Sequence, residues 1–195
     1  MLWKASVMLV ALVAATGCGV ETVARVPRAN ILGTIKGGGT FDVDVSSVPE
    51  GEVCSEQGGL KDVCVSGFRS AIRGGLEKVL DAYFDGAKSG PAYSLRFKLV
   101  RLSHSVTSGS TYEPTVKLTL RWQFELVNEA GEPLVQLAEM TDGPELLNNV
   151  EAADSAVESL LGAVMEKIAG AIKTADFSPK KEPLSSEATP SPPDE

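Results

Sequence analysis

The stretch Thr115–Val127, TVKLTLRWQFELV, decides the fold of this chain. Its even-numbered positions are all apolar, whereas the odd-numbered positions between them are polar or charged. Because side chains of a β-strand alternate between the two faces of a sheet, the pattern predicts a strand with one buried and one wet face. The apolar row includes Trp122 and Phe124, which we interpret as core residues rather than as a platform for a sugar or another ligand.

Neighbouring segments carry related patterns. Residues 128–132, NEAGE, have the composition of a short hairpin loop, and residues 134–140 are expected to return as an antiparallel strand ending at residues 141–144. Upstream, residues 93–99 alternate in the same way until the phase slips at Val100, where we expect a β-bulge. These segments therefore predict consecutive, wet-faced strands.

Two shorter β-like runs, residues 30–36 and 40–45, are separated by the glycines 37–39. The glycines indicate either a hairpin turn or a break, and they lack the following lysine that a phosphate-binding loop requires. In the second run Asp42 and Asp44 fall on one strand face, where two carboxylates could bind a cation or act as acid and base. We interpret them as a solvated face.

Two helices are predicted from apolar residues that recur every three or four positions, at about residues 64–87 and 149–175. Both contain glycines, at positions 74, 75, 162 and 170, although each costs up to about 1 kcal/mol relative to alanine in a helix. Close helix packing explains such glycines. The alternative is that a partner protein or an acyl chain approaches the helix layer there.

The order strand, helix, three strands, helix predicts an α+β fold. We expect a two-layer sandwich, in which an antiparallel sheet of four or five strands is covered on one face by two helices. This single domain is predicted to span residues 29–177. Residues 18–28 are expected to form a tether, and the proline-, serine- and glutamate-rich residues 178–195 a disordered tail.

Composition excludes some functions. The chain has 195 residues, 43% of them hydrophobic, and a formal net charge of −8. Removal of residues 1–17 takes away only Lys4 and leaves 17 basic and 26 acidic residues, a net charge of −9. Such a balance repels nucleic-acid phosphates and disfavours electrostatic adsorption to an anionic membrane, so we expect no nucleic-acid partner.

The N-terminus has the organisation of an export signal. A short region with Lys4 precedes ten uncharged, mostly apolar residues, 5–14, and then Ala15-Thr16-Gly17-Cys18. These four residues resemble a lipobox, the motif at which bacterial lipoproteins are cleaved and lipidated. The resemblance implies that residues 1–17 are a signal peptide and that Cys18 carries the lipid. An ordinary cleaved signal and an uncleaved anchor are the alternatives.

The resemblance also implies a location. Lipidated cysteines of this family carry three acyl chains in many species, enough for firm anchoring in a membrane. Residue 19 is glycine rather than aspartate, which favours passage to the outer membrane of a two-membraned cell. We therefore expect a lipoprotein of the cell envelope that carries palmitate, lies on the outer membrane and faces the periplasm.

The remaining cysteines form an even pair. With Cys18 assigned to lipid, Cys54 and Cys64 are left in an oxidising compartment, where a disulfide would stabilise the fold by roughly 3 kcal/mol. Free buried thiols and a metal site are the alternatives. The chain has one histidine, His104, which we interpret as a plain surface or strand residue, so we expect no metal, no cofactor and no catalytic residue.

The layout, with its N-terminal Cys18-Gly19, resembles small envelope lipoproteins of the lipopolysaccharide-assembly type, which support an outer-membrane β-barrel partner. Val20-Glu21-Thr22 departs from that family's phenylalanine and leucine pattern, and no binding residue is carried over. The leading hypothesis is a non-enzymatic lipoprotein that binds an envelope protein. A carrier or sensor of a hydrophobic ligand, such as a lipid, is the second hypothesis, and an enzyme is the third.

Overall fold

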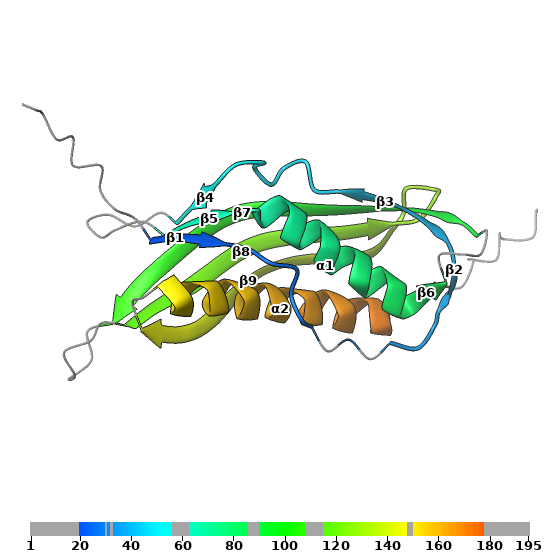
Figure 1. Ribbon diagram of the computed structural model, residues 1–195. Helices are drawn as coiled ribbons and strands as arrows, with labels where there is room; N and C mark the ends of the chain where they lie inside the picture. Colours follow the sequence, from blue (N-terminus) through cyan, green and yellow to red (C-terminus); the bar gives the residue numbers. More distant parts are fainter. Residues whose placement is uncertain are drawn as a thin grey trace, which may run out of the picture.

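The computed structural model describes residues 20–29, 31, 33–55, 63–85, 90–107, 115–147 and 150–177 (Figure 1). The predicted signal peptide, Cys18 and the predicted tail 178–195 lie outside these residues. Cys18 therefore enters the description only through its place in the sequence, two residues before the first described strand.

A four-stranded sheet forms one layer of the fold, in the order β3-β7-β8-β9. Its strands are β3 (Thr40–Asp44), β7 (Ala92–Thr107), β8 (Thr115–Val127) and β9 (Pro133–Leu147). Strands β7, β8 and β9 are antiparallel neighbours, as predicted, and the register slips between Leu99 and Arg101, where the bulge was expected. Strand β8 has the predicted bounds.

Two parts of the strand prediction are wrong. Strand β9 continues through Gly143 and Pro144 to Leu147 instead of ending before them, and the register between β8 and β9 is irregular between Lys117 and Thr119. Because β9 is an edge strand, a proline there removes no hydrogen bond to a further strand. Strand β3 pairs parallel to β7, because the chain between them passes through a helix and returns in the same direction.

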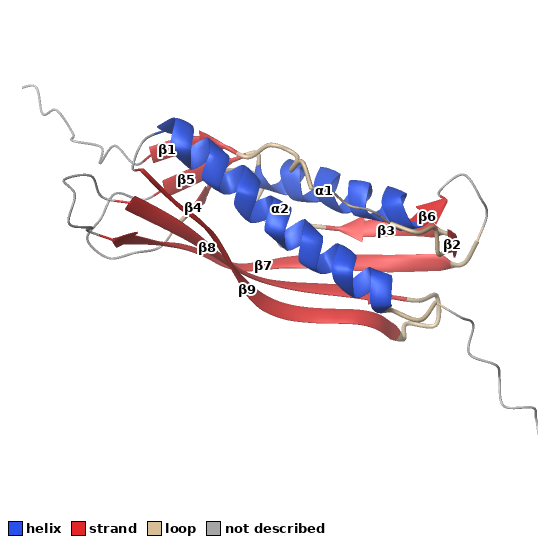
Figure 2. Ribbon diagram, turned by 90° about the horizontal axis from the view of Figure 1, so that it is seen from below, coloured by secondary structure: helices blue, strands red, loops and turns tan. Residues whose placement is uncertain are grey.

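Two helices cover one face of this sheet, α1 (Phe68–Tyr83) and α2 (Val150–Thr174), which confirms the predicted α+β two-layer sandwich (Figure 2). Helix α1 is shorter than the predicted 64–87. It begins after Gly67, whose φ of 68° lies in the left-handed region that glycine adopts without strain, and the residues before it form a strand instead.

Short strands complete the fold at its two ends. One group is β1 (Val20–Val23), β4 (Val53–Cys54) and β5 (Val63–Ser66), in the order β1-β5-β4. The other is a parallel pair, β2 (Gly37–Gly38) and β6 (Phe84–Asp85). The glycines 37 and 38 are therefore extended and form no hairpin turn, and residues 33–36 are not a strand. The break that was the alternative lies at Gly39, between β2 and β3 of two different sheets.

The predicted tether, residues 18–28, is wrong over much of its described length. Strand β1 pairs with β5, and Thr22 and Ala24 are buried, at 4% and 7% exposure. The Thr22 hydroxyl donates a hydrogen bond to the Asp154 carboxylate of α2. The segment is therefore held by both β5 and α2. The folded domain thus begins at Val20 rather than at residue 29.

The core lies between the two layers. Trp122 of β8 is fully buried, stacks on Phe97 of β7 at a centroid distance of 5.9 Å, and donates its indole N–H to the Thr141 hydroxyl at 2.9 Å. Phe124 is 2% exposed. The interpretation of Trp122 and Phe124 as core residues is confirmed.

The helical glycines divide into two kinds. A Cβ at Gly74 would lie 2.8 Å from Val26, and one at Gly75 would lie 3.0 Å from the Met165 sulfur of α2. Close packing explains these two. At Gly162 and Gly170 of α2, a Cβ would meet no described atom within 4 Å apart from neighbouring parts of its own helix, so packing does not explain them.

Candidate functional site

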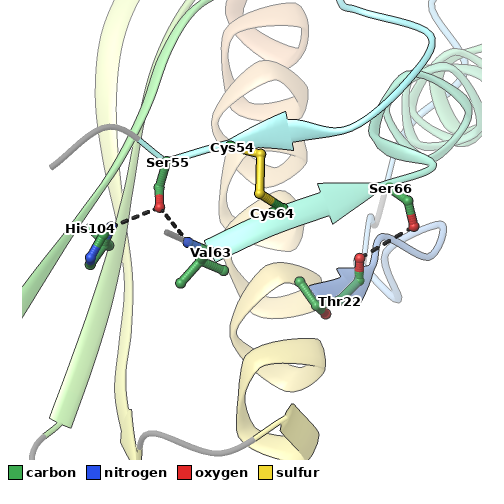
Figure 3. Close-up of a disulfide and its surroundings, with 7 residues drawn as sticks. All are labelled: Thr22, Cys54, Ser55, Val63, Cys64, Ser66 and His104. Atoms are coloured by element: carbon green, nitrogen blue, oxygen red, sulfur yellow. Dashed lines mark hydrogen bonds between the residues drawn. A yellow bond between two sulfur atoms is a disulfide. The ribbon is translucent and has the colours of Figure 1, made fainter. Parts of the chain in front are cut away.

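The single histidine lies beside the disulfide at one end of the sheet (Figure 3). The Nδ1 atom of His104, on β7, is 2.7 Å from the Ser55 hydroxyl oxygen, which also accepts the Val63 N–H at 2.9 Å. Ser55 and His104 are 1% and 5% exposed. His104 is therefore a buried strand residue and not a surface one.

The predicted cysteine pair is bonded. Cys54 and Cys64 lie directly opposite each other on the antiparallel strands β4 and β5, with an S–S distance of 2.04 Å. Donor atoms of Glu52 and of both cysteines lie within 4.8 Å of one another, a spacing compatible with a metal ion. Because each sulfur is bonded to the other, neither is a thiolate ligand in this state.

A hydroxyl within hydrogen-bond distance of an imidazole is also the arrangement of a nucleophile and its base. Sequence reasoning did not bring Ser55 and His104 together, because 49 positions separate them and no motif marks either residue. A substrate must reach the nucleophilic oxygen, however, and Ser55 is almost completely covered and already accepts a backbone N–H. We interpret the pair as a structural link between β4 and β7.

The two strand aspartates have separate surroundings. The Asp44 carboxylate accepts the Ser46 N–H at 2.8 Å, and hydrogen bonds from Ser46 hold the pKa of Asp44 below its usual value, assisted by the charges of Arg96 and Arg73. Asp42 is exposed. Neither carboxylate belongs to the metal-ligand cluster found among the described residues.

A large hollow lies at the other end of the sheet. We call it the aromatic hollow. It has a volume of about 920 Å³ and is bounded by β2, β6, the start of β7, the loop between β8 and β9, and the residues after α2. Its lining includes Lys36, Phe84, Tyr93, Glu129, Leu134 and Phe177.

Aromatic rings form the floor of the aromatic hollow. Phe177 packs edge-on against Phe84 and Tyr93, at centroid distances of 5.0 and 5.9 Å, and Phe41 stacks on Tyr93 at 5.2 Å. Burial raises the pKa of the Tyr93 phenol. A Cβ at Gly39 would lie 2.8 Å from the Tyr93 ring, so a glycine lets this segment pass directly against the floor.

The two sites lie at opposite ends of the fold. Tyr93 and His104 occupy β7 eleven positions apart, which corresponds to roughly 35 Å at about 3.3 Å per residue. Val20, the first described residue, is the register partner of Val63, next to Ser55. The start of the domain therefore lies at the disulfide end, away from the aromatic hollow (Figure 1).

Sequence reasoning missed the aromatic hollow. Its rings come from three segments, and each of them stands at or just beyond the end of a helix or strand, where apolar periodicity is weakest. In the predicted elements Phe84 was placed inside the helix 64–87, Tyr93 at the start of the strand 93–99, and Phe177 after the second helix, so no pattern brought the three rings together. No helix in the described ranges is long and apolar enough to cross a bilayer.

No protein-family model and no curated protein matches the sequence significantly. Among solved structures, a Xanthomonas campestris protein of the DUF330 family is 11% identical with a TM-score of 0.48, covering 80% of this chain and 94% of its own. A Caulobacter crescentus protein provisionally described as a lipoprotein is 11% identical with a TM-score of 0.45, covering 70% and 88%. A minor lipoprotein of Acinetobacter baumannii is 10% identical with a TM-score of 0.38, covering 71% and 97%. We draw nothing about function from similarities at this level.

Proposed function

We propose that this protein is an envelope lipoprotein held to a membrane by lipid on Cys18, and that its domain binds another envelope protein without catalysing a reaction. The observation that carries the proposal is that the fold begins two residues after the lipobox cysteine. Strand β1 starts at Val20, and Thr22 and Ala24 are buried. A lipid on Cys18 would therefore hold the disulfide end of the domain close to the membrane surface.

The cysteines support the same assignment. The chain has three cysteines, and two of them are joined in the disulfide, which leaves Cys18 as the single remaining thiol. Disulfides persist in exported proteins and are rare in reducing compartments. Gly19 at the position after the cysteine supports delivery to the outer membrane, with the domain facing the periplasm.

A non-enzymatic role is supported by the state of the groups that could do chemistry. The Ser55 and His104 side chains are buried and link two parts of the fold. Asp44 is engaged by Ser46, and the sulfurs of Cys54 and Cys64 are bonded to each other. These engaged groups support the proposal of binding rather than catalysis.

Metabolic labelling tests the anchor. Cells that express the full chain are grown with an alkyne analogue of palmitate, and the protein is then partitioned between detergent and aqueous phases. The wild type should carry the label and enter the detergent phase, whereas Cys18→Ser should do neither. The double variant Cys54→Ser and Cys64→Ser is the matched control and should label normally. A labelled Cys18→Ser protein, or an unlabelled wild type, would contradict the anchor.

Crosslinking in intact cells tests the binding role. A protein partner should be recovered with the wild type after crosslinking and detergent solubilisation, in a defined stoichiometry. Recovery of the crosslinked wild type alone would contradict the proposal.

The aromatic hollow favours a second candidate function, the carriage or sensing of a hydrophobic ligand such as a lipid. Its volume of about 920 Å³ is within the size range of small-molecule sites, and its lining includes the apolar side chains of Phe84, Leu134 and Phe177. Native mass spectrometry of the detergent-purified protein would reveal a bound lipid. A spectrum with only the mass of the lipidated chain would remove this candidate.

A further inference from the structure

We propose that the aromatic hollow binds a partner-protein segment that carries a large apolar side chain next to lysine or arginine. The inference rests on the function proposed above, because it specifies where and how the domain would contact a protein partner. Three features of the aromatic hollow carry it: its aromatic floor, the charge of its rim and its distance from the start of the chain.

The floor provides a preformed apolar contact surface. Phe84 and Tyr93 are 4% and 8% exposed, and Phe177 packs on both as the chain leaves α2. These rings support Phe177, which is partly exposed like Leu134, and a partner side chain can contact both of these residues. Offset and edge-to-face contacts between rings contribute about 0.5–1.5 kcal/mol beyond the burial of area. An aromatic or large aliphatic side chain of a partner can extend this cluster without rearrangement of the fold.

The charge of the rim determines which charged residues a bound segment can carry beside its apolar side chain. Among the described residues that line the aromatic hollow, three are acidic, Glu129, Glu132 and Asp176, and one is basic, Lys36. The mature chain as a whole, these residues included, has a net charge of −9, which favours the approach of cations to the aromatic hollow. A segment with lysine or arginine beside its apolar residue complements this rim, whereas an acidic segment is repelled.

Position and charge favour a protein segment over a membrane lipid. The aromatic hollow lies roughly 35 Å along β7 from the end at which the chain enters the fold, so a lipid anchor on Cys18 leaves it away from the bilayer surface. An anionic lipid headgroup would also meet the acidic rim. A basic segment of a periplasmic protein can reach the aromatic hollow at this distance from the bilayer, and its charge complements the acidic rim.

Peptide selection tests the proposal. The mature lipidated protein is placed in lipid nanodiscs and used to select from a phage-displayed library of random heptapeptides, with empty nanodiscs for subtraction. Selected peptides are then synthesised with a fluorescent label, and their affinities are measured by anisotropy. The variants are Glu129→Lys, which changes the rim on an exposed loop, and Phe177→Ala, which opens the floor. Glu52→Lys, at the disulfide end, is the charge-matched control.

We expect selected peptides that combine a large apolar residue with neighbouring lysine or arginine. Their affinity should fall about fivefold or more for Glu129→Lys and about tenfold for Phe177→Ala, and stay unchanged for Glu52→Lys. Absence of a consensus, an acidic consensus, or equal binding to all variants would overturn the proposal. So would a lipid that remains on the detergent-purified wild type and is missing from Phe177→Ala.

The two proposals can fail separately. Incorporation into nanodiscs requires the lipid on Cys18 and reports on the anchor. Peptide selection reports on the aromatic hollow alone, so a protein that inserts but selects no basic, apolar peptide retains the anchor and loses the binding site.

Discussion

The Nδ1 atom of His104 lies 2.7 Å from the hydroxyl oxygen of Ser55, and through this contact the disulfide-bonded strands are joined to the main sheet. The same oxygen accepts the Val63 N–H at 2.9 Å, so one hydroxyl connects the end of β4 to β5 and to β7. Both side chains are buried, and buried polar groups cost free energy unless they are hydrogen-bonded. The contact therefore stabilises the end of the domain at which the chain enters the fold.

Ser55→Ala should destabilise the protein by about 1–3 kcal/mol, because the substitution leaves the Val63 N–H and the His104 Nδ1 atom without this partner in a buried site. Urea denaturation followed by circular dichroism measures the change. The control is Ser70→Ala, at an exposed serine in the first turn of α1, which should change stability by less than about 0.5 kcal/mol. Equal losses for the two variants would contradict the structural role of Ser55.

The disulfide should contribute roughly 3 kcal/mol, since it closes a loop between residues ten positions apart and restricts the unfolded chain. A reducing agent should lower the thermal midpoint of the wild type. It should leave the midpoint of the Cys54→Ser and Cys64→Ser double variant, which is already lower, unchanged. A wild-type midpoint that is insensitive to complete reduction would show that the bond contributes no stability.

The strands and helices that were predicted correctly are those whose apolar periodicity lies within a single segment of the sequence. The alternation around Trp122 predicted β8 with its observed bounds, and the slip in phase at Val100 marked the bulge. The apolar stripe of α2 predicted its length within one residue at each end. Each of these signals lies within a single segment, so the periodicity of a strand or helix is enough to read it.

The features that the sequence did not predict depend on contacts between residues that are far apart in the chain. The Thr22 hydroxyl bonds to Asp154 across 132 positions, and this contact helps to make a fixed strand of the expected tether. The parallel pairing of β3 depends on the path of the chain through α1. The aromatic hollow joins Phe84, Tyr93 and Phe177, which no spacing rule connects.

The ion pair of Asp142 should make stability depend on pH in the acid range. The hydrogen bond from Lys117, followed by that from the Thr119 hydroxyl, holds the pKa of Asp142 below its ordinary value of 3.8. A lowered pKa stabilises the fold above the ordinary value, and the contribution is lost as the pH falls below 3.8. Asp142→Asn should therefore cost stability at pH 7, by less than about 1 kcal/mol because the pair is exposed, and the difference should vanish in strong acid.

Urea denaturation of the wild type and Asp142→Asn between pH 2 and pH 7 measures this difference. Asp81→Asn, at an exposed position of α1, is the control. A difference that grows as the pH falls would contradict the assignment, and 1 M salt should reduce the difference at pH 7.

The helical glycines Gly75 and Gly162 should respond to alanine in opposite directions, although the substitution is chemically the same. Alanine is favoured over glycine by about 1 kcal/mol in a helix interior. At Gly75 the new methyl group would lie 3.0 Å from the sulfur of the fully buried Met165, and overpacking of this kind costs about 1–3 kcal/mol. At Gly162 the methyl group would meet no described atom within 4 Å beyond its own stretch of helix. Urea denaturation should therefore show a net loss of about 1 kcal/mol for Gly75→Ala and a gain approaching 1 kcal/mol for Gly162→Ala, relative to the wild type. Two changes of the same sign and size would mean that α1 and α2 are not packed as closely at Met165 as the structure has them.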